Sequence, residues 1–110
     1  MNVTVTKKGN VNIVALKGSI DSKTAPTIRE DLLASLASAK DIVINMTEVD
    51  YLSSAGLRLL LLAYRDIAAK NGKVLLVGVS EEVQGVMSNT GFIKFFVLAA
   101  TESEALSALA

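Results

Sequence analysis

Two kinds of hydrophobic pattern alternate along the chain, one with a period of two and one with helical spacing. Residues 2–6 alternate apolar and polar side chains, which is typical of a half-buried strand. Gly9 and Asn10 follow as a candidate two-residue turn, and residues 11–17 then carry apolar side chains on both faces. The pattern predicts an opening β-hairpin whose second strand lies inside a sheet.

Helical spacing of leucine and isoleucine follows a polar loop at residues 18–26. Thr24 is placed to cap this first helix, and Pro26 falls in its first turn, where a missing N–H costs nothing. Beyond it, apolar β-branched runs and helical segments alternate, which predicts the order β-β-α-β-α-β-α-β-α. The expected strands cover 41–46, 73–79 and part of 92–98, a loop covers 47–53, and the expected helices end near 39, cover 54–70 and 80–90, and begin at 101.

An opening hairpin followed by alternating helices and strands predicts an α/β fold: one mixed sheet with about four helices packed on it. A doubly wound, flavodoxin-like sheet is the competing arrangement. The 110 residues fit a single domain spanning 1–110, long enough for a hydrophobic core without disulfides.

The composition removes most catalytic chemistry. The chain has no cysteine and no histidine, which excludes disulfides, thiol catalysis and the commonest metal ligands. A serine nucleophile at the start of the 54–70 helix would lack a His or Lys to activate it, so we expect no enzyme, no metal and no cofactor. With 11 basic and 11 acidic residues, nothing favours a nucleic-acid partner.

A mean hydropathy of +0.46 calls for a check against membrane segments. The apolar run at 59–64 is far shorter than the roughly 20 residues of a spanning helix, and residues 11–16 are too short for a secretory signal. We therefore expect a cytoplasmic protein without membrane insertion. Its excess hydrophobicity must lie in a sheet buried on both faces or in a surface that meets a partner.

The most informative stretch lies where the strand at 41–46 leads, through a loop, into the 54–70 helix. Ser53 and Ser54 meet the first helical turn, whose N–H groups lack partners and carry a partial positive charge. A serine there can cap the helix, which is its ordinary role, or accept a phosphoryl group. Ala55 and Gly56 are small and allow another group to approach the backbone.

The same helix has an outward-facing stripe. Its core-facing positions are expected to be Leu57, Leu60, Leu61, Tyr64, Ile67 and Ala68. Leu62 then lies outward between Arg58 and Arg65, which favours an apolar contact with a basic rim for a partner helix. Alternatively, the neighbouring helix at 80–90 covers Leu62.

Five short segments carry a family resemblance over essentially the whole chain. They are Gly18-Ser19-Ile20-Asp21 with Thr24-Ala25, Ile44-Asn45-Met46, Ser53-Ser54-Ala55-Gly56-Leu57 after Tyr51-Leu52, Gly91-Phe92, and Glu104-Ala105-Leu106. In this order they resemble the STAS domain of bacterial anti-sigma factor antagonists. The resemblance implies that residues 1–110 are a single STAS domain.

This resemblance implies a phosphorylation-controlled binding protein. In its unphosphorylated form it would bind a cognate anti-sigma factor, itself a serine kinase of GHKL type, and so release a sigma factor. That kinase would phosphorylate Ser54, and a PP2C-type phosphatase would reverse the modification. Ser53 stands where many members have Asp, which makes it the alternative acceptor. The free protein would be a monomer.

Other residues are implied to contact the partner, and Asp21 matches an acidic first-loop position of the family. Together with Arg58 and Leu62 of the outward stripe, the candidate partner contacts are Asp21, Ser22, Thr24, Ser53, Ala55, Gly56, Arg58 and Leu62. Asp21 has an equally ordinary alternative role as a loop carboxylate that caps the next helix. The alternative function is a STAS scaffold or regulatory subunit outside sigma control, in a stressosome-like or lipid-transport ATPase complex.

Overall fold

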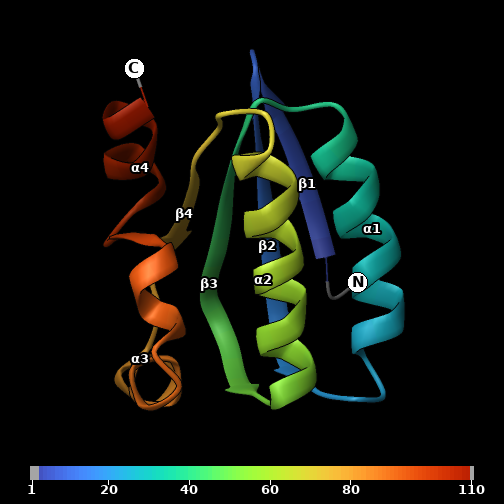
Figure 1. Ribbon diagram of the computed structural model, residues 1–110, viewed down its shortest axis with the longest axis vertical. Coiled ribbons are helices and arrows are strands. Elements are labelled where there is room, and N and C mark those ends of the chain that lie inside the picture. The colour runs from blue at the N-terminus through green and yellow to red at the C-terminus, as the bar shows by residue number, and fades with distance from the viewer. Residues whose placement is uncertain (1–2, 110) are drawn as a thin grey trace.

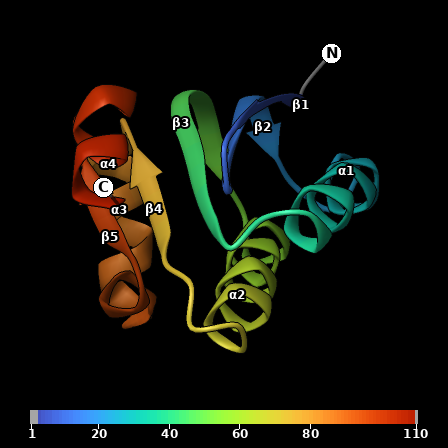
Figure 2. The ribbon, with the colours of Figure 1, turned by 90° about the horizontal axis from the view of Figure 1, so that it is seen from above.

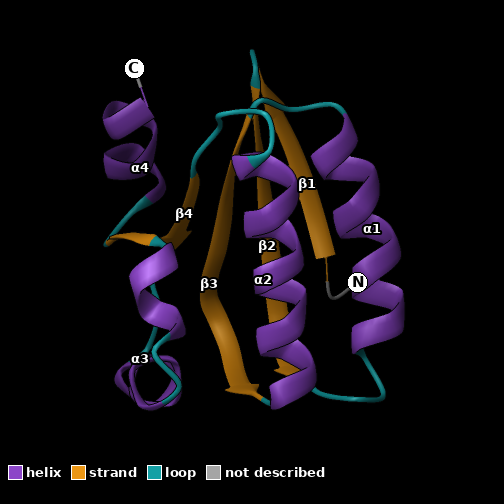
Figure 3. Ribbon diagram, viewed as in Figure 1, coloured by secondary structure: helices purple, strands orange, loops and turns teal. Residues whose placement is uncertain are grey.

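The computed structural model describes residues 3–109, which form one five-stranded sheet with helices on both faces (Figures 1 and 3). The predicted order of strands and α-helices is confirmed. The elements are β1 (Val3–Lys8), β2 (Val11–Ile20), α1 (Ala25–Ala37), β3 (Asp41–Leu52), α2 (Ser54–Ala68), β4 (Val74–Val77), α3 (Glu81–Asn89), the 3₁₀ helix η1 (Phe92–Phe95), β5 (Val97–Ala99) and α4 (Glu102–Leu109). Asn2, with which the first strand was expected to begin, lies outside the described residues.

The strands lie in the sheet in chain order, β1-β2-β3-β4-β5. The pair β1–β2 is antiparallel and the other three pairs are parallel, which confirms the mixed sheet. A doubly wound sheet is excluded because its strand order reverses at a switch point. Since right-handed crossovers all advance in one direction, α1, α2 and α3 are expected on the same face. Their buried side chains indeed join one cluster, whereas α4 packs on the other face (Figure 2).

The opening hairpin has the predicted turn and the predicted two-faced inner strand. Lys8 pairs with Val11 across the turn, and Gly9 there adopts a φ of 62°, which favours glycine. On β2, Val14 belongs to the cluster under α1 and α2, whereas Ile13 belongs to the cluster under α4. Burial on both faces explains the unbroken apolar run of this strand.

The two central strands extend beyond the predicted bounds, so the expected loops at 18–26 and 47–53 are wrong in part. β2 continues to Ile20 and β3 to Leu52, and these two residues pair. The register shifts between Gly18 and Ser19, where Gly18 has a φ of 86°. The polar side chains in this part of β3 hid the strand, since they face solvent beyond the reach of α4. The extension brings the ends of β2 and β3 directly beneath the start of α2.

The remaining differences are small. Residues 92–95 form the 3₁₀ helix η1, so the expected strand within 92–98 is reduced to β5. α2 ends as predicted before Asn71, whose φ is 61°. Lys70 then donates from Nζ to the carbonyl oxygens of Leu36 and Ala39 at 2.6 Å each, which joins the end of α2 to the last turn of α1. Within residues 3–109, none of the helices has the length and apolar character required to span a membrane.

Candidate functional site

Ser53 is the N-cap of α2. Its Oγ accepts a hydrogen bond from the N–H of Gly56 at 3.3 Å and donates one to the carbonyl of Ile20 at 2.9 Å. Its own N–H donates to the same carbonyl at 2.9 Å. The hydroxyl is half-buried and used in both directions, so Ser53 ties the end of β2 to the helix start.

Ser54 is the first residue of α2 and is exposed. Its hydroxyl has no hydrogen-bond partner among residues 3–109, in contrast to that of Ser53. The first bond within the helix runs from the N–H of Leu57 to the carbonyl of Ser53, and the N–H of Gly56 is capped. The N–H groups of Ser54 and Ala55 therefore lack a helical acceptor and favour negative charge beside Ser54.

Packing within the protein leaves no room for a side chain at Gly56. A Cβ at this position would meet Leu52 Cδ1 below contact distance and would lie 2.9 Å from Ile20 Cγ2. Gly56 is buried, so the group that approaches its backbone is the hydrophobic core itself. The close approach that the sequence predicts at Gly56 is therefore made by Leu52 and Ile20, and a contact of Gly56 with a partner stays a prediction. Ala55 beside it is half-buried and lines the open side of the helix start.

Asp21 and Thr24 bond to each other reciprocally in the loop between β2 and α1. The Asp21 carboxylate Oδ1 accepts from the N–H groups of Lys23 and Thr24 at 2.9 and 3.1 Å, and Thr24 Oγ1 accepts from the N–H of Asp21 at 3.0 Å. Thr24 occupies the N-cap position of α1, but its side chain makes no cap bond and donates instead to the carbonyl of Ser19. The expectation that Thr24 caps α1 is therefore wrong. The Asp21 carboxylate bonds to N–H groups that precede the first helical residue, Ala25, so the alternative that it caps α1 is not supported either.

These hydrogen bonds lower the pKa of Asp21 below its ordinary value of 3.8, because the charged carboxylate accepts from the N–H of Thr24 first and of Lys23 second. A lowered folded-state pKa stabilises the loop above pH 3.8, and this contribution is lost as the pH falls through the folded value. An NMR titration of the Asp21 carboxyl carbon should give a midpoint below 3.8. The amide shifts of Lys23 and Thr24 should follow the same midpoint, and D21N should abolish the step. A midpoint at or above 3.8 contradicts this account.

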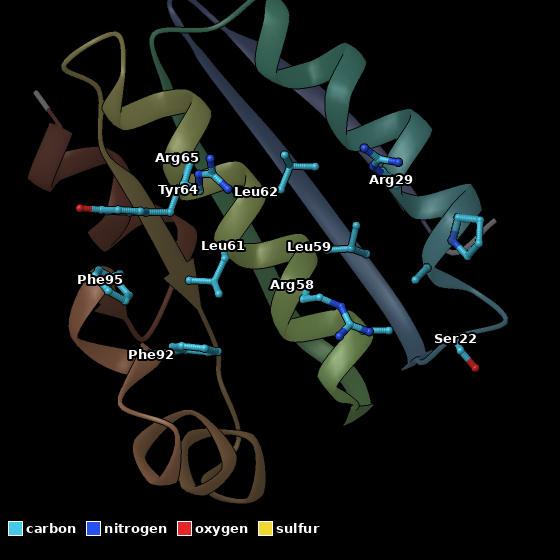
Figure 4. Close-up of a pocket in the computed structure, with 13 residues that line it drawn as sticks. Ser22, Arg29, Arg58, Leu59, Leu61, Leu62, Tyr64, Arg65, Phe92 and Phe95 are labelled. Atoms are coloured by element: carbon cyan, nitrogen blue, oxygen red, sulfur yellow. The ribbon is translucent and has the colours of Figure 1, made fainter.

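The β2–α1 loop and the start of α2 lie together. The two bonds from Ser53 to the carbonyl of Ile20 place the chain just before Asp21 against the helix start. Ser22 is exposed in this loop and lines the same groove as Ala55 and Arg58 (Figure 4). Seven of the eight candidate partner-contact residues therefore remain in one surface region, and Gly56 lies beneath it.

The predicted outward-facing stripe of α2 is present, but the side chains that α2 buries are not all the predicted ones. Leu59 and Ala63 are buried, whereas Leu61 and Tyr64 are half-buried. The reason is that α2 crosses the sheet between α1 and η1 and is flanked on both sides. Leu62 is half-buried in a groove whose other walls are α1 and η1, so the alternative that the helix at 80–90 covers it is not supported.

Sequence reasoning missed three residues of this surface. Arg29 on α1 lines the groove opposite α2, and Phe92 and Phe95 line it from η1 (Figure 4). Phe95 is 46% exposed and Phe92 is half-buried, whereas Phe96 beside them is buried in the core. The i, i+3 spacing of Phe92 and Phe95 was the available signal, because a single 3₁₀ turn places both on one side.

Comparison with known proteins identifies the family. The family profile described as STAS domain matches residues 2–105. The chain therefore belongs to the STAS domain family.

Within residues 3–109 the structure shows no cluster of three or more side chains suited to holding a metal ion.

Proteins similar to this chain carry the name anti-sigma factor antagonist. The anti-sigma-B factor antagonist of Bacillus subtilis is 29% identical over 93 residues, which cover 83% of this chain and 85% of that protein. The crystal structure of an anti-sigma factor antagonist from Mycobacterium paratuberculosis is 30% identical with a TM-score of 0.86 and covers 96% of this chain and 91% of that one. SpoIIAA in its unphosphorylated form shares the fold at 22% identity, with a TM-score of 0.84 and coverage of 97% and 95%.

Proposed function

We propose that this protein is an anti-sigma factor antagonist that binds an anti-sigma factor through the start of α2 and the β2–α1 loop. The observation that carries the proposal is the difference between two adjacent serines. Ser53 uses its hydroxyl to hold the helix to β2, whereas Ser54 presents its hydroxyl to solvent at the same helix end. Ser54 is therefore the residue available to a kinase, and Ser53 is the structural cap.

The chemistry of the helix start favours phosphorylation of Ser54 without a change of fold. A phosphate carries about −1.5 to −2 charges near neutral pH, which the unpaired N–H groups of the first turn stabilise. Arg58 is exposed one turn further on, at the i+4 spacing that lets side chains on a helix meet. SpoIIAA has been solved in both its unphosphorylated and its phosphorylated form, and both share the fold of this chain, the latter with a TM-score of 0.78. This supports a switch that changes surface charge and leaves the fold intact.

The proposed partner is both the target and the modifying enzyme: an anti-sigma factor that is a serine kinase. Binding of the unphosphorylated protein would occupy the anti-sigma factor and release its sigma factor. Phosphorylation of Ser54 would end this binding, and a PP2C-type serine phosphatase would restore it. Because Ser54 is exposed in the free protein, both enzymes can reach it without unfolding α2.

The test is to incubate the protein with ATP and each kinase-type anti-sigma factor of its source, and to map phosphate by mass spectrometry. We expect modification of Ser54, abolished in S54A. S53A is the matched control: it should still be phosphorylated, although loss of the cap costs about 1 kcal/mol of stability. Phosphate on Ser53 would contradict the assignment of the site. No phosphate and no binding to any such kinase would overturn the proposed function in favour of a STAS scaffold outside sigma control.

A further inference from the structure

The surface beside the helix start continues as a long groove. Its volume is about 930 Å³, and its walls come from the first turns of α1, from the outward side of α2 and from η1 (Figure 4). At one end it includes Ser22 and Ala55, next to Ser54, and at the other it reaches Arg65 and Phe95. Arg65 lies eleven residues after Ser54, about 16 Å along a helix that rises about 1.5 Å per residue. The groove therefore extends well beyond the reach of a phosphate on Ser54.

The groove combines an apolar floor with positive charge. Its apolar lining residues are Ala25, Pro26, Ala55, Leu59, Leu61, Leu62, Tyr64, Phe92 and Phe95. The charged residues among its lining are three arginines, Arg29, Arg58 and Arg65, all exposed. None of the described residues that line it is an aspartate or glutamate. Because the chain as a whole is neutral, with 11 basic and 11 acidic residues, this local excess is a property of the groove.

We propose that the groove receives an amphipathic, acidic helix of the anti-sigma factor, a proposal that rests on the function proposed above. Apolar side chains of that helix would pack on Leu59 and Leu62, which lie on the side of α2 that faces α1 (Figure 4), and carboxylates on its flanks would pair with the arginines at the rim. The span of about 16 Å matches three turns of such a helix. Binding would thus have two parts, a phosphorylation-sensitive contact at Ser54 and an electrostatic contact along α2.

The shape of the surface favours a protein segment over an anionic membrane. Leu59 is buried and Leu61, Leu62 and Tyr64 are half-buried, so the apolar side chains that α2 contributes lie lower than the exposed arginines, and only Pro26 and Phe95 among the larger apolar lining residues are exposed. A flat bilayer requires apolar side chains that protrude beyond their charged neighbours, as on an amphipathic interfacial helix. A convex helix can reach the floor of a groove and the charged rim at the same time.

The deciding variant is R65E, because Arg65 is too far from Ser54 to act through the phosphorylation site. Its binding to the anti-sigma factor that the wild-type protein binds is measured by biolayer interferometry at about 50 and 200 mM salt. We expect affinity to fall by about tenfold or more, mainly through slower association, with the loss smaller at high salt. K17E is the matched control, since Lys17 is exposed on β2 away from α1 and α2, and should stay within about twofold. R65Q, which keeps the long side chain, should give an intermediate loss.

The outcomes separate this inference from the proposed function. If R65E and K17E bind alike while Ser54 is still phosphorylated, the groove is not part of the interface and the inference is overturned, although the proposed function stands. Retention of the wild-type protein by vesicles of anionic phospholipid that R65E reduces, without an effect on the anti-sigma factor, would overturn it in favour of a membrane. A concentration-dependent dimer of the chain alone that L62D abolishes would overturn it in favour of a second copy. Thermal unfolding confirms that each variant is folded.

Discussion

Phosphorylation of Ser54 is expected to weaken binding of the anti-sigma factor by between about a hundredfold and several thousandfold. The phosphate adds about −1.5 to −2 charges at a surface that the partner must cover. An uncompensated charge buried in an interface costs about 3–5 kcal/mol, and each 1.4 kcal/mol is a factor of ten in affinity.

Isothermal titration calorimetry of the stoichiometrically phosphorylated and the unmodified protein measures this difference. S54E should reproduce part of it, and S54A should bind about as well as the wild-type protein. S103E is the matched control, because Ser103 is also exposed in the first turn of a helix, α4, but on the opposite face of the sheet. It should change affinity by less than about twofold. A loss of less than about threefold for phospho-Ser54 would show that this helix end lies outside the interface.

Replacement of Gly56 by alanine is expected to destabilise the folded protein by about 1–3 kcal/mol. The added Cβ would overlap Leu52 Cδ1 and would crowd Ile20, both nearly fully buried at the ends of β3 and β2. Because the N–H of Gly56 also donates to Ser53, a shift of the helix to relieve the overlap would strain the cap. The candidate site therefore depends on a close approach between the helix start and the core.

Gly85 on α3 supplies the matched control. It is an exposed glycine inside a helix, and a Cβ there would meet nothing within 4 Å. G85A should therefore raise stability by about 0.5–1 kcal/mol, since alanine favours the helix over the unfolded chain. Urea unfolding of both variants measures the two effects with opposite signs. Equal effects of G56A and G85A would contradict the close packing of the helix start.

The helices and strands were predictable from the sequence wherever a local pattern of residues is compatible with only one structure. The two-faced apolar run of β2 requires burial on both sides, so its position inside the sheet follows from the sequence. Ser80 illustrates the same point for a helix end: a serine before two acidic residues predicts an N-cap, and its hydroxyl does accept from the N–H of Val83. Such features involve neighbours within a few residues, so the sequence contains all the information they need.

The site was predictable in location but not in its internal roles. The capping pattern placed Ser53 and Ser54 at a helix start and could not separate them, because both positions suit a cap. Only the family resemblance favoured Ser54 as the acceptor. The carbonyl of Ile20, 33 residues away along the chain, engages the hydroxyl of Ser53 and leaves that of Ser54 exposed. Thr24 was assigned the wrong role for a local reason: its hydroxyl accepts from the N–H of Asp21 and donates to the carbonyl of Ser19, so it is not used by the first turn of α1.

The sequence by itself determined the order of the elements, the mixed sheet and the helix end that carries the two serines, because these depend on periodicity and local capping chemistry. Only the tertiary structure decided which of the two serines faces solvent, why Gly56 is required, and how α1, α2 and η1 enclose an apolar groove bordered by arginines. These features arise between segments distant in the chain, and their geometry depends on how the sheet twists and how far its central strands extend.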